Sequence, residues 1–280
     1  SAIPKTTEAN RYILQILLAL NRVDEAGQAL SVSIRELPAA EQNAAIASVP
    51  RVFARVQDKK AAADTVEIAL AAALKQSSTA ASAWTTVGRM RREAGQLGLA
   101  VEATRQGYAA DATAPGPLIL ALSLVSAAPG EMTPLLNQAM QGQVQPELRL
   151  GYARHLIGLP QHDEALRQLT RLNAEHPSFA DGWLVHGLLL QETDQLAHAE
   201  QKLRKHVELA QASQDKEVQS QLAEALLALT QIAQRQGQLP QAEQWLAQVP
   251  SDADPIKLAS RRADLLTQQG RMEEARQVLV

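Results

Sequence analysis

Apolar residues recur along this chain at the spacing of amphipathic helices, in short segments separated by breaks. In residues 146–158, "PELRLGYARHLIG" places Leu148, Tyr152 and Leu156 on one helical stripe. A break at "LPQH" follows, and "DEALRQLTRLNAEHP" predicts a second helix that Pro177 ends. The same order of helix, break and helix returns along the chain. The pattern therefore predicts an all-α fold built from helix pairs.

A small residue marks the second helix of each predicted pair. Ala100 follows Trp84 at the same distance at which Ala199 follows Trp183. The position recurs at Ala26, Ala62, Ala100, Ala165, Ala199, Ala242 and Ala275, and we assign Pro134 to the one remaining unit. These steps predict a single array over residues 1–280, with units starting near residues 7, 43, 81, 115, 146, 180, 223 and 256.

Glycine recurs on the first helix of two units. Gly88 and Gly187 each follow the unit's Trp by four residues. We expect Gly88 to face Ala100 and Gly187 to face Ala199, because missing side chains let two helix backbones approach closely. A large or charged side chain at Ala199 would overpack this crossing, at a cost of roughly 1–3 kcal/mol.

These residues resemble the tetratricopeptide repeat (TPR), whose pattern is W-x2-L-G-x2-Y, then A-x3-F, then Pro. The best matches are Trp84-Val87-Gly88-Ala100, Trp183-Gly187-Leu190-Ala199-Leu203 and Ala165-Leu169-Pro177. The resemblance implies a right-handed superhelix (solenoid) of about eight TPR-like repeats. The chain departs from the pattern at His186 and Arg262, which occupy a normally apolar packing position, and at Pro50, which falls within a first helix.

A narrower resemblance covers residues 226–279, which look like the large TPR lipoproteins of Gram-negative bacteria. That likeness implies a periplasmic adaptor for a carboxy-terminal processing protease, with a lipid anchor outside this segment. The chain starts at Ser1 without Met and stops within a helical pattern, so we expect it to be a piece of a longer protein. A cytoplasmic assembly scaffold and the TPR section of an exopolysaccharide secretion machine are the alternatives.

Composition limits how the core is built and which partners and sites the chain can have. The 280 residues are 46% hydrophobic but only 3% aromatic, so the core must consist of Ala and Leu. A net charge of -3 gives no general attraction to nucleic acid. Cysteine is absent, which excludes disulfides and thiolate zinc sites. The longest apolar run, at residues 117–125, is too short to span a bilayer, and we interpret it as a buried helix.

No catalytic, cofactor or metal pattern is present in the sequence. Phosphate-binding glycine loops, a nucleophile elbow and a Cys nucleophile are all missing. No two of the six histidines have the i, i+4 spacing of a helical metal site; they are His155, His162, His176, His186, His198 and His206. Apart from His186, we expect them at the surface. The acidic pairs at residues 24–25, 163–164 and 273–274 fit the first turn of a second helix, where negative charge is favourable.

Candidate binding residues come from the first helices, which line the concave surface of a TPR array. Three positions per unit are expected to face it, and five of these 24 are Arg: Arg11, Arg51, Arg89, Arg92 and Arg154. Arg51, Arg89 and Arg154 share one position, so we expect them to form a ladder. Guanidinium groups pair with carboxylates through two parallel hydrogen bonds. The alternative is that they are solvated or paired with neighbouring Glu.

An apolar strip is expected to follow this ladder. It consists of Leu150, Ile157, Leu184 and Leu188, and Gln191 completes the predicted site. Arg beside apolar side chains suits a peptide that carries a carboxylate and apolar residues. The predicted groove contains no Trp or Tyr, which argues against a sugar ligand. We therefore predict a non-catalytic protein- or peptide-binding scaffold; binding on the convex face is the alternative.

Overall fold

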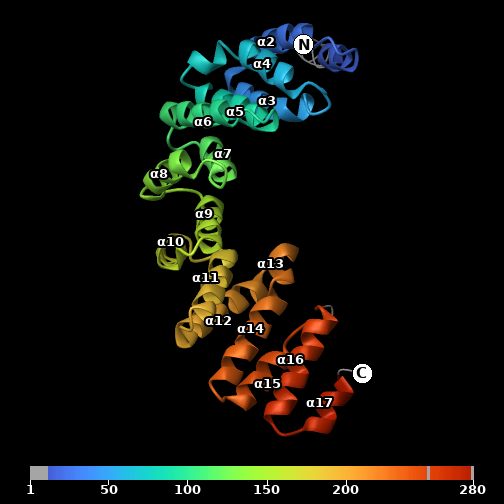
Figure 1. The fold of residues 1–280 in the computed structure, drawn as a ribbon, viewed down its shortest axis with the longest axis vertical. Coiled ribbons are helices and arrows are strands. Elements are labelled where there is room, and N and C mark those ends of the chain that lie inside the picture. Colours follow the sequence, from blue (N-terminus) through green and yellow to red (C-terminus); the bar gives the residue numbers. More distant parts are fainter. Residues whose placement is uncertain (1–11, 251–252, 279–280) are drawn as a thin grey trace. The chain divides into compact units, whose positions relative to one another are not determined.

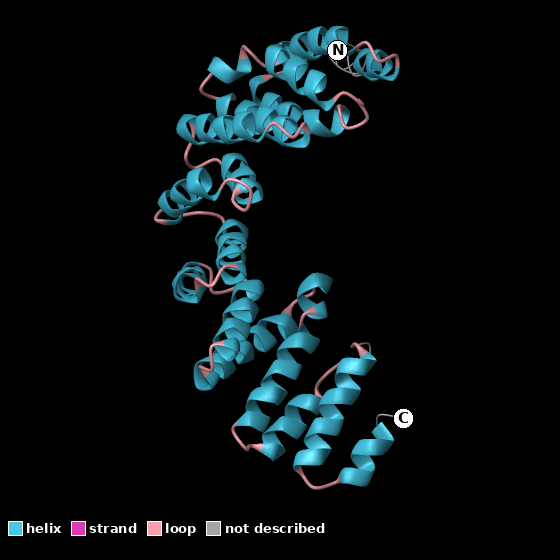
Figure 2. Ribbon diagram, in the orientation of Figure 1, coloured by secondary structure: helices cyan, strands magenta, loops and turns pink. Residues whose placement is uncertain are grey.

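The computed structural model describes residues 12–250 and 253–278, and these contain helices and loops but no strand (Figures 1 and 2). Residues 12–19 are helical. The α-helices that follow are α2 (Val23–Glu36), α3 (Ala39–Val52), α4 (Lys59–Ala69), α5 (Ala80–Glu93), α6 (Leu97–Ala110), α7 (Pro115–Leu124), α8 (Pro129–Met140), α9 (Pro146–Gly158), α10 (His162–Glu175), α11 (Ala180–Glu192), α12 (Leu196–Ala212), α13 (Lys216–Ser220), α14 (Leu222–Arg235), α15 (Leu239–Ala247), α16 (Pro255–Gln268) and α17 (Met272–Val278). A short 3-10 helix, η1, covers Ala73–Lys75. None of the described helices is both long and apolar enough to cross a membrane.

The helices follow one another as helix–turn–helix pairs. The helix at residues 12–19 pairs with α2, α3 with α4, α5 with α6 and α7 with α8. Further along the chain, α9 pairs with α10, α11 with α12, α14 with α15 and α16 with α17, whereas η1 and α13 are short additions between pairs. The predicted all-α repeat fold is confirmed.

The chain divides into two compact units, residues 1–148 and 149–280. In the first unit, α5 packs against α3, α4, α6 and α7, so it is central to that stack. In the second unit, α14 packs against α12, α15 and α16. Both cores consist mainly of Ala, Leu and Val, as the low aromatic content requires.

Five of the helix pairs share one turn. The second residue after the first helix has a left-handed backbone, with φ between 57° and 78°, at Asn21, Gly95, Asp194, Gly237 and Gly270. The next N–H returns to a carbonyl five residues back, as Gln96 N does to Arg91 O at 2.9 Å. This is the Schellman arrangement, in which a left-handed residue closes the helix end. It turns the chain within two residues and starts the second helix at once.

The turn explains the spacing of the small residues. In each of these five pairs the left-handed residue lies five positions before the recurring Ala of the second helix, as Gly95 lies before Ala100. The Ala is the fourth residue of the second helix in these pairs and also in α4 and α10. It is 0% exposed at Ala26, Ala62, Ala100, Ala165, Ala199 and Ala242, and 6% exposed at Ala275. In α8 the fourth residue is Met132, also 0% exposed, whereas Pro134 is exposed. The assignment of Pro134 was therefore wrong, and Met132 occupies the position.

The two first-helix glycines lie against the second helix of their own pair. A Cβ at Gly88 would lie 3.5 Å from the Ala100 carbonyl oxygen and 2.4 Å from a methyl of Leu120. A Cβ at Gly187 would lie 2.6 Å from Leu203 Cγ. Close packing at both glycines is thus confirmed, but Gly187 meets Leu203, one turn beyond Ala199.

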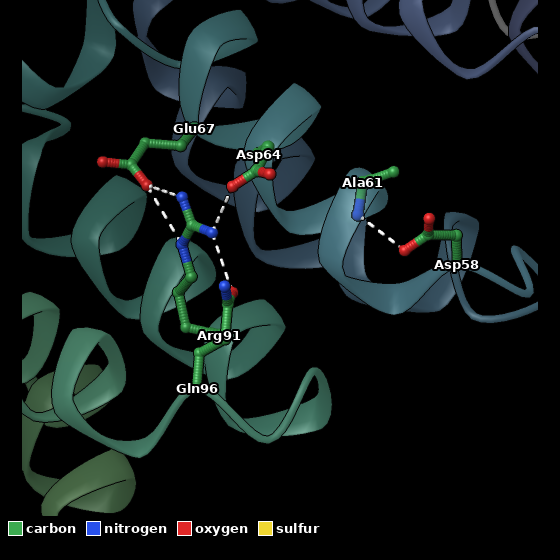
Figure 3. Close-up of polar contacts among 6 residues, drawn as sticks. All are labelled: Asp58, Ala61, Asp64, Glu67, Arg91 and Gln96. Carbon is green, nitrogen blue, oxygen red and sulfur yellow. Dashed lines mark hydrogen bonds and ion pairs between the residues drawn. The ribbon is translucent and has the colours of Figure 1, made fainter.

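Arg91 links two neighbouring pairs in a way that the sequence analysis missed (Figure 3). Its side chain, 8% exposed, extends from α5 to Asp64 and Glu67 on α4. The guanidinium also donates to Gln96 Oε1 at 2.8 Å and to Glu67 Oε2 at 2.5 and 3.1 Å. Burial alone would lower the pKa of Arg91, but the hydrogen bonds to Glu67 and Asp64 raise it above its ordinary value. Arg91 therefore stays charged and holds α4 against α5.

Two histidines are buried in the second unit. His186 was expected at a packing position and is 4% exposed; its Nδ1 lies 3.0 Å from Asn173 Nδ2. The expectation that His206 lies at the surface was wrong, because it is 0% exposed and its Nδ1 lies 3.0 Å from the Ala180 carbonyl oxygen. Arg262 is exposed and so does not enter the core.

The predicted acidic first turns are present. Asp24 and Glu25 begin α2, residues 163–164 begin α10, and residues 273–274 begin α17. Carboxylates there offset the positive end of the helix dipole. Their structural interpretation is confirmed.

Candidate binding cleft

A cleft of about 570 Å³ opens in the first unit along three first helices, α3, α5 and α7. Ala47 on α3, Thr85 and Arg89 on α5, and Ile119 on α7 contribute to its lining. These four side chains come from positions that the repeat pattern places on the concave surface. Its volume lies within the roughly 300–1,000 Å³ typical of ligand-binding clefts.

Arg89 and Arg92 give the cleft its positive charge. Both line it, both are exposed, and neither makes an ion pair within the described part of the chain. They are three residues apart on α5, so their charges are neighbours on one helix face and repel each other. By contrast Arg91, between them in sequence, points the other way into its pair with Asp64 and Glu67. An anionic ligand group would relieve the repulsion that Arg89 and Arg92 retain.

The hydroxyl groups of the cleft wall are directed mainly at the protein backbone. Ser82 donates to the Asn43 carbonyl at 3.3 Å, Thr85 to Ala81 at 2.7 Å, and Ser123 to Leu120 at 2.7 Å. Their hydrogens are therefore already used, which leaves the two guanidinium groups as the strongest donors facing the cleft.

The apolar wall comes from α7. Leu118, Leu120 and Leu124 are buried at 1–2% exposure, so most of the apolar run at residues 117–125 is core, as expected. Ile119 is the exception: it is 57% exposed and lines the cleft. A ligand that covered Ile119 would gain roughly 25 cal/mol for each Å² of apolar surface removed from water.

Other predicted groove residues lie apart from this cleft. Arg51 is exposed on α3 but does not line it. Arg154, on α9, is exposed and belongs to the second unit, and Ile157 on the same helix is half-buried. Arg11 lies outside the described residues.

Two residues of the predicted apolar strip are core residues. Leu150 is 3% exposed and Leu184 is 4% exposed, and Leu184 packs in a cluster with Leu203 and Leu226. This burial leaves neither side chain available to a partner. Leu188 is half-buried against the same cluster.

Gln191 takes part in a polar chain across three first helices of the second unit. Its Nε2 donates to Gln231 Oε1 on α14 at 3.0 Å, and Arg261 Nη2 on α16 donates to the same oxygen at 3.3 Å. Neither interaction was anticipated from the sequence.

The cleft also contains a residue that the sequence analysis missed. Asp111, in the loop between α6 and α7, lines it and accepts hydrogen bonds from the Thr113 hydroxyl at 2.7 Å and the Thr113 N–H at 2.9 Å. These bonds lower the pKa of Asp111 below its ordinary value. The three-residue pattern Asp-x-Thr after a helix was the only signal for this residue. Across the described residues no group of three His, Cys, Asp or Glu side chains could hold a metal ion.

Comparison with family models and with curated proteins finds no match for the chain. Solved structures do match it. The apo form of RapI is 14% identical over 98% of this chain and 84% of its own, with a TM-score of 0.58. The C-terminal part of a TPR repeat-containing protein from Cytophaga hutchinsonii is 14% identical over 97% of this chain and 99% of its own, with a TM-score of 0.53. PilF from Pseudomonas aeruginosa is 15% identical over 81% and 99%, with a TM-score of 0.50.

At these identities the likeness concerns the fold. The repeated helix pairs, the small residue at the fourth position of the second helices and the structural matches agree with one another. The chain therefore has the fold of a tetratricopeptide-repeat protein.

Proposed function

We propose that the chain is a non-catalytic interaction scaffold whose first unit binds an acidic, extended polypeptide segment in the cleft along α3, α5 and α7. The observation that carries this proposal is the pair Arg89 and Arg92, exposed in a cleft beside Ile119 and without a carboxylate partner among residues 12–250 and 253–278. Arg beside exposed apolar surface matches a ligand with carboxylates and apolar side chains. The cleft lining includes no His or Cys, which supports binding rather than catalysis.

A sugar ligand fits this cleft less well. Sites for carbohydrate usually present an aromatic ring on which the apolar face of a sugar stacks, and neither Trp nor Tyr lines the cleft. This argues against the exopolysaccharide alternative at this site.

The test uses the full chain and two synthetic peptides with blocked ends, Leu-Asp-Leu-Glu-Leu and its uncharged counterpart Leu-Asn-Leu-Gln-Leu. Calorimetric titration should detect binding of the acidic peptide and binding at least tenfold weaker for the uncharged one. The double variant Arg89→Glu, Arg92→Glu should weaken acidic-peptide binding more than tenfold, a loss of about 1.4 kcal/mol. Raising the salt concentration should weaken it too, because charge attraction is screened.

The matched control is Arg35→Glu, Arg105→Glu, which changes the net charge equally at two exposed positions of second helices. It should change the affinity less than twofold. Equal binding of both peptides, or an equal loss in the control variant, would show that the cleft is not an acidic-peptide site.

For the cellular setting we propose a periplasmic adaptor, anchored at the outer membrane, that presents a carboxy-terminal processing protease or its substrates. Support comes from the resemblance of residues 226–279 to TPR lipoproteins of that kind. The test is fractionation of cells that produce the natural full-length protein, followed by co-purification with the protease. Recovery in the cytoplasm would overturn this setting and leave the peptide-binding proposal standing.

A further inference from the structure

The cleft of the first unit carries opposite charges toward its two ends. Arg89 and Arg92 lie on the last turns of α5, whereas Asp111 follows the end of α6. A Cβ at Gly107 would lie 3.5 Å from the Ala81 carbonyl oxygen, so the last turn of α6 runs beside the first turn of α5. Asp111 therefore lies at the end of the cleft where α5 begins, opposite the two arginines.

The length between these ends can be estimated from the helix. From Ala81 to Arg92, α5 rises roughly 16 Å at about 1.5 Å per residue. An extended peptide advances about 3.3 Å per residue, so roughly five residues span the same length. A ligand segment of that size could engage both ends at once.

The acidic end is held in place. Both the hydroxyl and the N–H of Thr113 donate to Asp111 Oδ1, which orients the carboxylate and lowers its pKa. Between the ends, Ile119 offers exposed apolar surface. The order along the cleft is thus a fixed anion, an apolar side chain and two cations.

We infer that this cleft binds a segment with opposite charges at its two ends, with a cationic group at Asp111, an apolar side chain on Ile119 and a carboxylate at Arg89 and Arg92, about five residues apart. The inference rests on the proposed function, because it assumes that the arginines bind the acidic end. Charge complementarity at both ends gives specificity, since a segment lying the wrong way would place like charges together. The cationic group can be a Lys side chain or a free α-amine.

Peptides with and without the cation test this charge pattern. Lys-Ala-Leu-Ala-Glu and Gln-Ala-Leu-Ala-Glu, both with blocked ends, are titrated into the full chain by calorimetry. The Lys peptide should bind at least fivefold more tightly than the Gln peptide. A free α-amine in place of the Lys side chain tests the second source of positive charge.

The protein-side test is Asp111→Asn, which preserves a side-chain oxygen for Thr113. It should remove the preference for the Lys peptide over the Gln peptide and leave binding of the Gln peptide unchanged. Glu102→Gln, an exposed carboxylate on α6, is the matched control and should preserve the preference. If Asp111→Asn alters the circular dichroism spectrum, the comparison of Lys with Gln peptides on the unmodified chain still shows whether the cleft binds a cationic group.

Equal affinity for the Lys and Gln peptides would overturn this inference. Dependence of binding on the Glu residue and on Arg89 and Arg92 would then still support the proposed function. If binding does not depend on the Glu residue, both proposals fail.

Discussion

The Thr86 hydroxyl on α5 donates a hydrogen bond of 3.0 Å to the backbone carbonyl of Ile46 on α3. In an α-helix that carbonyl would accept the N–H of the residue four positions later, which here is Pro50 and has no N–H. Thr86, 1% exposed, thus supplies from a neighbouring repeat the donor that Pro50 lacks. The proline that departs from the repeat pattern is accommodated between repeats rather than within its own helix.

Replacing Thr86 by Val should therefore destabilise the chain by about 1–3 kcal/mol, because the Ile46 carbonyl is left buried without a donor. In a Pro50→Ala background the restored N–H reaches Ile46, so the same replacement should cost much less. Urea unfolding followed by circular dichroism measures both values. Thr104→Val is the control, since the Thr104 hydroxyl bonds to Ala100 within its own helix. A cost for Thr86→Val that is the same in both backgrounds would rule out this compensation.

Arg91→Met should destabilise the first unit by roughly 1–3 kcal/mol. The loss stays below that of a fully buried pair, because the side chains of Asp64 and Glu67 are 48% and 37% exposed and can be rehydrated. Arg92→Met, on the neighbouring residue, should change the free energy of unfolding by less than about 0.5 kcal/mol. Similar losses in the two variants would mean that Arg91 does not join α4 to α5.

His186 should make the second unit less stable in mild acid. Burial, with a smaller contribution from Lys202, lowers its pKa to about 4, against an ordinary value of 6.5. An amide nitrogen can only donate, so the contact with Asn173 Nδ2 also requires an unprotonated Nδ1. Between pH 6.5 and pH 4 the unfolded chain binds a proton that the folded chain does not. Stability is therefore lost as the pH falls through that window, by about 2 kcal/mol between pH 7.5 and pH 5.

The measurement compares urea unfolding of the natural chain with that of His186→Leu at pH 7.5 and pH 5. The variant should lose about 2 kcal/mol less than the natural chain over this range. His198→Leu, at an exposed position of α12, should retain the full pH dependence. An unchanged pH dependence in His186→Leu would assign the acid sensitivity to other groups.

Gly187→Ala should lower the melting temperature, because its Cβ would lie 2.6 Å from Leu203 Cγ and 3.2 Å from the Leu203 backbone nitrogen. Overpacking of this kind costs about 1–3 kcal/mol. The control is Gly98→Ala in α6, where the new Cβ meets nothing within 4 Å. There the change should raise stability by about 0.5–1 kcal/mol, because Ala is the better helix former. Two variants with the same melting temperature would contradict the packing described at Gly187.

The fold was predictable because its signals are local. The left-handed residue, the small residue five positions later and the helical stripes all lie within one pair, as Gly95 and Ala100 do. Pro134 was predicted in place of Met132 because the other units have a small side chain at this position, whereas the position requires a buried one. That distinction depends on what the neighbouring helices leave open.

The binding site was less predictable because exposure depends on the next helix. Ile119, Leu150 and Leu184 occupy the same position of their repeats, yet the first is 57% exposed and the others are 3% and 4% exposed. Asp111 lies in a loop and follows no period. Arg91 and Arg92 are adjacent in sequence, and only the packing of the helices shows that Arg91 joins α4 to α5 whereas Arg92 lines the cleft.

The Schellman turn and its buried Ala have a consequence for how such a protein can diverge. The register of α5 against α6 is set by Gly95 and Ala100, and the side chains of Arg89 and Arg92 take no part in it. Substitutions of Arg89 and Arg92 therefore carry little folding penalty, so the ligand preference of the cleft can change while the helix pair keeps its register. A few small residues maintain the fold, and the residues that contact a ligand can change independently of them.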